Sequence, residues 1–128
     1  MRKIKFRIWD NLTNEMYYDA LVGNCRGEST VPCVYLNEVG WTHTDNCVVE
    51  QFTGLYDKNG TEIYEGDILY FDLYKTSINN RVVKFKKSMF TGELLRNSYA
   101  YPIDEIEVNE HIVIGNIHDN PELIGETK

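Results

Sequence analysis

The chain has 128 residues and a formal net charge of −7 at pH 7. This length is typical of one domain or of a domain with an appended part, and it can bury a core without disulfides or metal. The negative charge counts against general binding to duplex nucleic acid, because proteins that bind duplexes usually carry a basic surface. No apolar run approaches the roughly 20 residues that span a bilayer, and the basic N-terminus lacks the apolar core of a signal peptide. We therefore expect a cytoplasmic protein without membrane contact.

The N-terminal part predicts a β-hairpin followed by a long loop. Residues 3–9 alternate between apolar and basic side chains, which is the period of a half-buried strand. The two faces of that strand are Ile4, Phe6 and Ile8 against Lys3, Lys5 and Arg7. Turn-forming residues at 10–14 let residues 15–18 return as the second strand. Residues 20–46 are punctuated by Gly and Pro, so we expect a long loop there with one short strand or helical turn, and the only extended candidate is 33–36.

The middle of the chain, residues 47–71, holds the clearest signals. A β-branched strand at 47–52 leads to a turn at Asp57-Lys58-Asn59-Gly60, where Asn and Gly tolerate positive φ. A second turn at Glu65-Gly66-Asp67 opens onto the β-favouring run 68–71. Two glycine-centred reversals are therefore expected to fold this stretch back on itself.

The C-terminal part predicts further short strands and a helical turn. Residues 72–80 are polar enough for a loop, 81–86 alternate like a strand, and Gly92 is expected to break the chain before it restarts at 93–96. Residues 103–108 are ambiguous between a strand and a turn of helix, whereas 111–115 form a clear strand. We expect Asn120 to cap a short helix that begins at Pro121. The sequence therefore predicts a mainly β protein.

Four stretches resemble the YopX family of phage and prophage proteins. They are residues 5–10 (Lys-Phe-Arg-Ile-Trp-Asp), 51–55 (Gln-Phe-Thr-Gly-Leu), 56–68 around the two glycine turns, and 113–123 (Val-Ile-Gly-Asn-Ile-His-Asp-Asn-Pro-Glu-Leu). The resemblance implies a small β-rich protein whose C-terminal part is an SH3-like barrel, and it carries over no catalytic residue. We accordingly expect an N-terminal β-hairpin and variable loop region over residues 1–50, a YopX-type SH3-like barrel over 51–128, and a short C-terminal helical turn.

Residues 75–96 are the most basic part of the chain. They hold six Lys and Arg residues against Glu93 alone, a net charge of +5, whereas residues 97–128 hold seven carboxylates against Lys128, a net charge of −6. Interleaved with the cations are the aromatic residues Tyr74, Phe85, Phe90 and Tyr99. Three interpretations stay open: a groove that tracks nucleic acid, a Lys-rich strand face in solvent, and a basic surface that meets the acidic segment of another subunit. The residues selected for nucleic-acid or subunit contact are Lys84, Lys86, Lys87 and Arg96.

Other clusters are weaker candidates for chemistry. A cation site would need the oxygens of Asp57, Asn59, Glu62, Glu65 and Asp67, but their spacing departs from a Ca²⁺ loop and also suits ordinary turns. A zinc site would need Cys25, Cys33, Cys47 and His43, which lack closely spaced pairs, so the cysteines are expected to be free thiols. No motif frames a nucleophile beside His43, His111 or His118. We therefore predict no enzyme activity and no cofactor.

The sequence thus favours a non-enzymatic YopX-type protein that works through protein contacts. The expected partner is a second copy of the chain, with another phage or host protein also possible. The alternative is a regulatory module that binds nucleic acid through residues 75–96, which the net charge disfavours.

Overall fold

The computed structural model describes residues 4–24, 32–36, 40–43, 47–72, 80–103 and 110–124, with side chains given for all of these except residue 19 and those between 21 and 43. The chain divides into two compact units, Met1–Phe52 and Thr53–Lys128. This division falls two residues after the boundary expected from the sequence. Within the described residues, the only helical element is a single 3-10 turn, so the prediction of a mainly β chain is confirmed.

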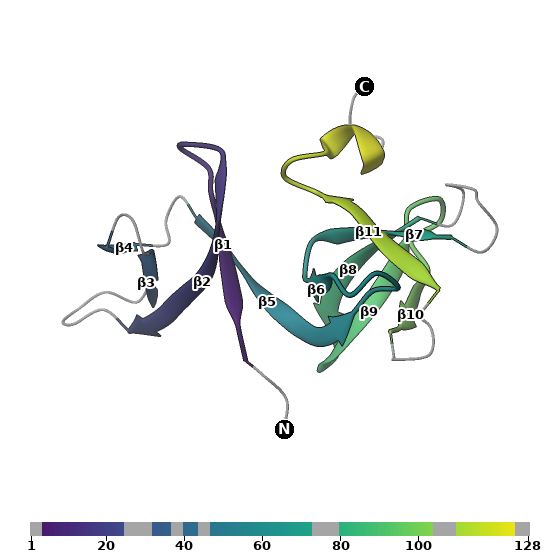
Figure 1. The fold of residues 1–128 in the computed structure, drawn as a ribbon, viewed down its shortest axis with the longest axis horizontal. Coiled ribbons are helices and arrows are strands. Elements are labelled where there is room, and N and C mark those ends of the chain that lie inside the picture. Colours follow the sequence, from purple (N-terminus) through teal and green to yellow (C-terminus); the bar gives the residue numbers. More distant parts are fainter. Residues whose placement is uncertain are drawn as a thin grey trace. The chain divides into compact units, whose positions relative to one another are not determined.

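The first unit is built on antiparallel strands (Figure 1). The strands are β1 (Phe6–Asp10), β2 (Glu15–Asn24), β3 (Pro32–Leu36), β4 (Gly40–His43) and β5 (Cys47–Tyr56), and β5 runs on into the second unit, where β6 lies beside it. The strand order of this sheet is β4-β3-β2-β1-β5-β6. The predicted hairpin is confirmed as β1 and β2. A small core forms around Ile8 and Ala20, which are both buried.

Two expectations for this unit are wrong. Residues 20–46 were expected to be a long loop with one short element. The extended candidate at 33–36 is present as β3, but β2 also continues to Asn24, and β4 pairs with β3 as a second hairpin. Arg7 was expected on a solvent face, yet it is 2% exposed and its Nε donates to Glu50 Oε1 at 2.7 Å. The register of β1 and β5 places these two residues directly opposite each other. Burial of the guanidinium is possible because a carboxylate from a strand 43 residues away accompanies it.

The second unit contains a five-stranded antiparallel sheet that curls around its own core (Figure 1). After the end of β5, the elements of the second unit are β6 (Glu62–Tyr64), β7 (Asp67–Phe71), β8 (Arg81–Lys86), β9 (Met89–Leu94), β10 (Ala100–Pro102), β11 (His111–Asn116) and the 3-10 turn η3 (Pro121–Ile124). Of these strands, β6 pairs with β5 and is not part of the five-stranded sheet. The sheet order is β10-β9-β8-β7-β11. The core groups Ile63, Leu69, Val83 and Ile103. This arrangement is consistent with the predicted SH3-like barrel.

The two glycine-centred turns of the middle stretch are confirmed. Gly60 and Gly66 have φ values of 85° and 86°, a conformation that costs a glycine little. The Asp57 carboxylate holds the first turn by accepting hydrogen bonds from the N–H groups of Asn59 and Thr61, both at 2.8 Å. Asp67 holds the second by accepting from the Tyr64 N–H. Both reversals are therefore fixed by side chains as well as by glycine.

Two further expectations for this unit need correction. Gly92 does not break the chain, because β9 runs unbroken from Met89 to Leu94. Asn120 precedes η3, as expected, but its side chain does not cap that turn. Its Oδ1 instead accepts a hydrogen bond at 3.2 Å from the N–H of Asn116, which precedes the turn in the sequence. The predicted loop at 72–80 and the ambiguous segment at 103–108 fall almost entirely outside the described residues.

Candidate functional site

The predicted contact residues lie on or next to the hairpin of β8 and β9. These strands pair from Arg81 opposite Leu94 to Lys86 opposite Met89, so only Lys87 and Ser88 form the turn. Both turn residues have positive φ, 51° and 66°, as a tight two-residue hairpin requires. Neither residue is Gly or Asn, so we infer that the strand pairing fixes this turn.

Two of the predicted cations share one carboxylate. Lys84 Nζ lies 2.9 Å from Glu93 Oε2, and Lys86 Nζ lies 2.8 Å from Glu93 Oε1. Hydrogen bonds from Lys86 and, to a smaller extent, Lys84 lower the pKa of Glu93. Their effect is larger than that of partial burial, which would raise this pKa. The group of three carries a net charge of +1. Two of the positive charges on this strand, those of Lys84 and Lys86, are thus paired with Glu93 within the hairpin.

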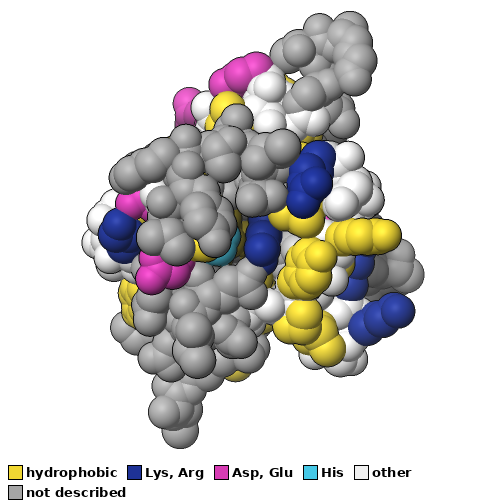
Figure 2. Space-filling view, turned by 90° about the vertical axis from the view of Figure 1, so that its right-hand side faces the viewer, with side chains coloured by type: hydrophobic (Ala, Val, Ile, Leu, Met, Phe, Trp, Pro, Cys, Tyr) yellow, Lys and Arg dark blue, Asp and Glu magenta, His cyan; other side chains and the backbone are white. Residues whose placement is uncertain are grey.

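The end of the hairpin, residues 85–89, is exposed throughout, and we call it the hairpin tip. Phe85 is 50% exposed and Met89 is 45% exposed. Phe85 also packs edge-on against Phe90, with ring centroids 4.9 Å apart. Figure 2 shows hydrophobic side chains gathered beside basic ones on one face of the molecule. The tip therefore combines apolar area with the positive charges of Lys86 and Lys87.

Arg96, the fourth predicted residue, is not part of the tip. It is exposed and lies beyond Leu94, at the opposite end of β9. The structure therefore brings Lys84, Lys86 and Lys87 onto one hairpin and leaves Arg96 apart from them.

Sequence reasoning missed a cation–aromatic pair on the same strands. The guanidinium of Arg81 lies 5.3 Å from the ring centroid of Tyr101 on β10. Burial lowers the pKa of Arg81. Gly92 lies between them on β9, where a Cβ atom would come within 3.0 Å of Arg81 Cδ. The glycine read as a break therefore provides space for a side chain that crosses the strand. Only the strand register could have revealed this.

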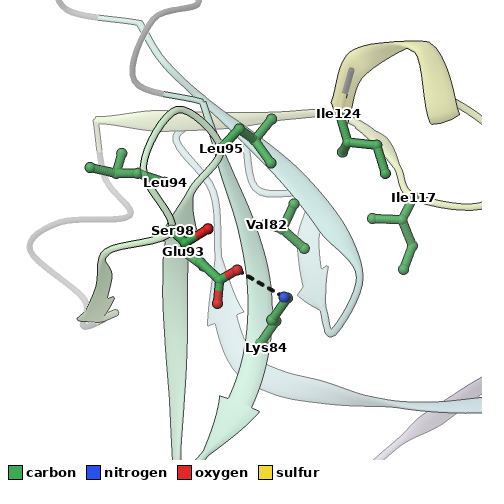
Figure 3. Close-up of a pocket in the computed structure, with 8 residues that line it drawn as sticks. All are labelled: Val82, Lys84, Glu93, Leu94, Leu95, Ser98, Ile117 and Ile124. Carbon is green, nitrogen blue, oxygen red and sulfur yellow. Dashed lines mark hydrogen bonds and ion pairs between the residues drawn. The ribbon is translucent and has the colours of Figure 1, made fainter. Parts of the chain in front are cut away.

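A pocket of about 250 Å³ lies beside the hairpin (Figure 3). Figure 3 shows Ile117 and Ile124 of the C-terminal segment across from Val82, with the Lys84–Glu93 ion pair toward one end. The complete lining is Val82, Lys84, Glu93, Leu94, Leu95, Ser98, Ile117 and Ile124. The cavity therefore has both an aliphatic and a charged end.

Two members of the acidic cluster considered as a cation site, Asp57 and Asp67, hold the turns. Asp57 is 5% exposed, and besides the two turn amides it accepts a hydrogen bond from the Val113 N–H at 2.9 Å. Asp67 is 2% exposed and accepts from the Tyr64 N–H. Across the described segments, no three His, Cys, Asp or Glu side chains are placed to hold a metal ion. Cys25 and the side chains of Cys33 and His43 lie outside what the structure describes.

Of the two histidines whose side chains are described, His111 is buried in the second unit and His118 joins the closing turn through its backbone. His111 is 2% exposed and stacks on Phe71 with centroids 4.9 Å apart. Burial, followed by repulsion from Arg81, lowers its pKa to about 4. The His118 N–H donates to Asn116 Oδ1 inside the closing turn. Cys47 is a partly buried free thiol, and desolvation raises its pKa, which makes it a poor nucleophile at neutral pH.

Comparison with protein-family models matches residues 5–125 to the family described as YopX protein. The chain belongs to the YopX family. This match spans both units and all four stretches singled out in the sequence. In the described part of the chain, no helix is both long and apolar enough to cross a membrane.

Two crystal structures resemble the whole chain. Protein EF1440 from Enterococcus faecalis is 29% identical, with a TM-score of 0.69 over 97% of this chain and 99% of its own. Protein yopX from Bacillus subtilis is 18% identical, with a TM-score of 0.60 over 96% of this chain and 98% of its own, and shows a similar fold. The comparison with curated protein sequences gave no match.

Proposed function

We propose that this YopX family member is a non-enzymatic, phage-derived cytoplasmic protein that works through protein contacts, first with further copies of itself. The contact surface that we assign is the hairpin tip. The observation that supports it most is the exposure of five consecutive residues, including Phe85 and Met89 at about half of their surface. Covering a large apolar side chain completely is favourable by roughly 1.5–3 kcal/mol.

The geometry of the tip suits insertion into a partner. Phe85 pairs with Phe90 and Lys86 pairs with Met89 in the strand register, so Phe85 and Met89 lie on opposite faces of the hairpin. A partner that closes around the tip would cover both. Addition of a strand along β10, one of the two edges of the sheet, is less suitable, because β10 has only three residues and ends in Pro102, which has no N–H to donate.

The proposed absence of catalysis rests on how the described polar groups are used. Asp57 and Asp67 accept backbone hydrogen bonds, and His111 is buried against Phe71. A catalytic base needs a nucleophile within hydrogen-bond reach in an accessible cleft. The roles seen for these side chains are structural.

The test is the mass in solution, measured by light scattering from micromolar to millimolar concentration. We expect the wild type to exceed the 14.9 kDa of one chain. The double variant Phe85→Ser/Met89→Ser should stay near one chain. Leu12→Ser is the matched control, because Leu12 is 73% exposed in the first unit. A wild type of one-chain mass at every concentration would overturn the proposal.

A charge-based form of self-association is also open to test. The +5 and −6 segments could meet between subunits, although Lys84 and Lys86 already face Glu93. If charge dominates, the mass should fall toward one chain in high salt. If the apolar tip dominates, the mass should hold.

Binding of single-stranded nucleic acid is the second candidate function. It is favoured by one observation: the exposed ring of Phe85 directly precedes Lys86 and Lys87. A base stacked on an aromatic side chain contributes about 1–3 kcal/mol, and nearby cations follow the phosphates. The test is anisotropy of a labelled oligonucleotide at rising salt, with Phe85→Ser and Lys87→Met. The absence of any salt-dependent binding would rule this candidate out.

A further inference from the structure

The pocket beside the hairpin differs in character from the tip. Four of its aliphatic walls come from three separate parts of the second unit: Val82 on β8, Leu95 after β9, and Ile117 and Ile124 in the C-terminal segment. Figure 3 shows Leu95, Ile117 and Ile124 lying away from the ion pair, with Val82 between them and Lys84. A ligand here would place an apolar body against them and a polar group near Lys84 and Glu93.

The charged end of the pocket favours an anion. Glu93 already accepts from Lys84 at one oxygen and from Lys86 at the other, so both of its oxygens are engaged. Lys86 lies outside the lining, but because it engages the second Glu93 oxygen, the group of three keeps one excess positive charge at this end of the pocket. Lys84 is only partly buried, with 42% of its side chain exposed, and an ammonium group can donate to further acceptors. The Ser98 hydroxyl in the lining supplies another donor.

The walls are held in place by the backbone. The Leu95 N–H donates to the Asn80 carbonyl at 3.1 Å, and the Ser98 N–H donates to the Leu94 carbonyl at 2.8 Å. On the other side, the Ile117 N–H donates to the Gly66 carbonyl at 2.9 Å. A preformed cavity loses less conformational entropy when a ligand binds.

We infer that this pocket binds a small carboxylic acid with an aliphatic body, the carboxylate beside Lys84 and Ser98 and the chain against Val82, Leu95, Ile117 and Ile124. The volume of about 250 Å³ lies just below the usual range for ligand pockets, roughly 300–1,000 Å³, which restricts the ligand to a chain of medium length at most. The inference does not require self-association through the hairpin tip, although Lys86 of the tip engages one Glu93 oxygen.

The test is a methyl and amide NMR titration of the full chain with octanoate. Matched probes are octanol, which has the chain without the charge, and octylammonium, which reverses the charge. We expect saturable shifts at Val82, Leu95, Ile117 and Ile124, with a dissociation constant of about 1 mM for so small a ligand. Octanol should bind more weakly, and octylammonium should bind weakest.

A pair of variants separates the ion pair from general charge. Lys84→Met should weaken octanoate binding roughly two- to five-fold, as expected for a partly exposed ion pair, and leave octanol binding unchanged. Lys87→Met removes the same charge at the hairpin turn outside the pocket and should bind like the wild type. If Lys84→Met does not fold, the order of affinity of octanoate, octanol and octylammonium for the wild type still tests the inference. Shifts elsewhere, no saturation, or octylammonium binding as tightly as octanoate would overturn the inference.

Discussion

The two glycine-centred turns, at Gly60 and Gly66, and the hairpin tip are two parts of the second unit that differ in how far their side chains are buried. At the turns, one buried carboxylate, Asp57, accepts three backbone hydrogen bonds and joins residues 57–61 to β11. At the tip, residues 85–89 are all exposed, and two of them are large and apolar. The first region is satisfied within the chain, whereas the second leaves apolar area in contact with water.

The residues that identify the family are therefore not those of the hairpin tip that we propose to bind a partner. The stretches that resemble the family, around Gly60, Gly66 and Asn116, hold turns together. Asn116 is 8% exposed, and its Oδ1 accepts from the N–H groups of His118 and Asp119, both at 2.9 Å. Recognising these residues therefore establishes the fold without naming an activity.

The largest expected effect comes from removing the acceptor at the first turn. Asp57→Ala leaves the amides of Asn59, Thr61 and Val113 without their acceptor, and we expect a loss of about 3–5 kcal/mol in the free energy of unfolding. The measurement is urea denaturation. Asp57→Asn is the control, because it retains one oxygen acceptor and should lose less. A loss below about 1 kcal/mol for Asp57→Ala would contradict the role assigned to this carboxylate.

The next effect is a pH dependence of stability that comes from the buried His111. Burial lowers the pKa of His111 to about 4, below the value near 6.5 expected when unfolded. The unfolded chain therefore binds a proton first, and stability should fall as the pH drops from about 6.5 to 4, by on the order of 3 kcal/mol in all. Denaturation midpoints at several pH values measure this, and His111→Gln should flatten the curve. The depressed pKa of Glu93 adds a loss only at more acidic pH, as that carboxylate becomes protonated.

A smaller effect is expected at Gly115. A Cβ atom there would lie 2.3 Å from Asn120 Oδ1, so Gly115→Ala must displace the side chain that accepts from the Asn116 N–H. We expect a cost of about 1–3 kcal/mol. In an Asn120→Ala background the same substitution should cost much less, which a double-mutant cycle would detect. Additive losses would show that the clash is not the cause.

The smallest effect is expected at the tip. Lys86→Met removes an exposed ion pair with Glu93, and such pairs contribute about 0.2–1 kcal/mol. The variant should unfold within about 0.5 kcal/mol of the wild type. A larger loss would place the tip among the structural parts of the molecule and remove the contrast with the turns.

Local sequence signals predicted the elements whose causes are local. Gly60 and Gly66 marked both turns, and the alternation at 81–86 marked β8. Gly92 misled because a glycine in a strand can also make space for a side chain that crosses it, here that of Arg81.

Contacts between distant residues were not predictable in the same way. Arg7 looked like a solvent-facing residue because its partner, Glu50, lies 43 positions away. Lys84 and Lys86 looked like free cations because only the β8–β9 register brings Glu93 beside them. The pocket needed three separate segments to meet, so no single stretch of sequence signals it.

The contrast between satisfied turns and an open tip is tested most directly by amide hydrogen exchange at low and high protein concentration. The amides of Asn59, Thr61 and Val113 should be protected equally at both concentrations, because Asp57 holds them within the chain. The amides of the turn residues Lys87 and Ser88 should exchange fast when dilute and slow down when concentrated, as a second copy covers the tip. Tip amides that exchange at the same rate at both concentrations would contradict the account.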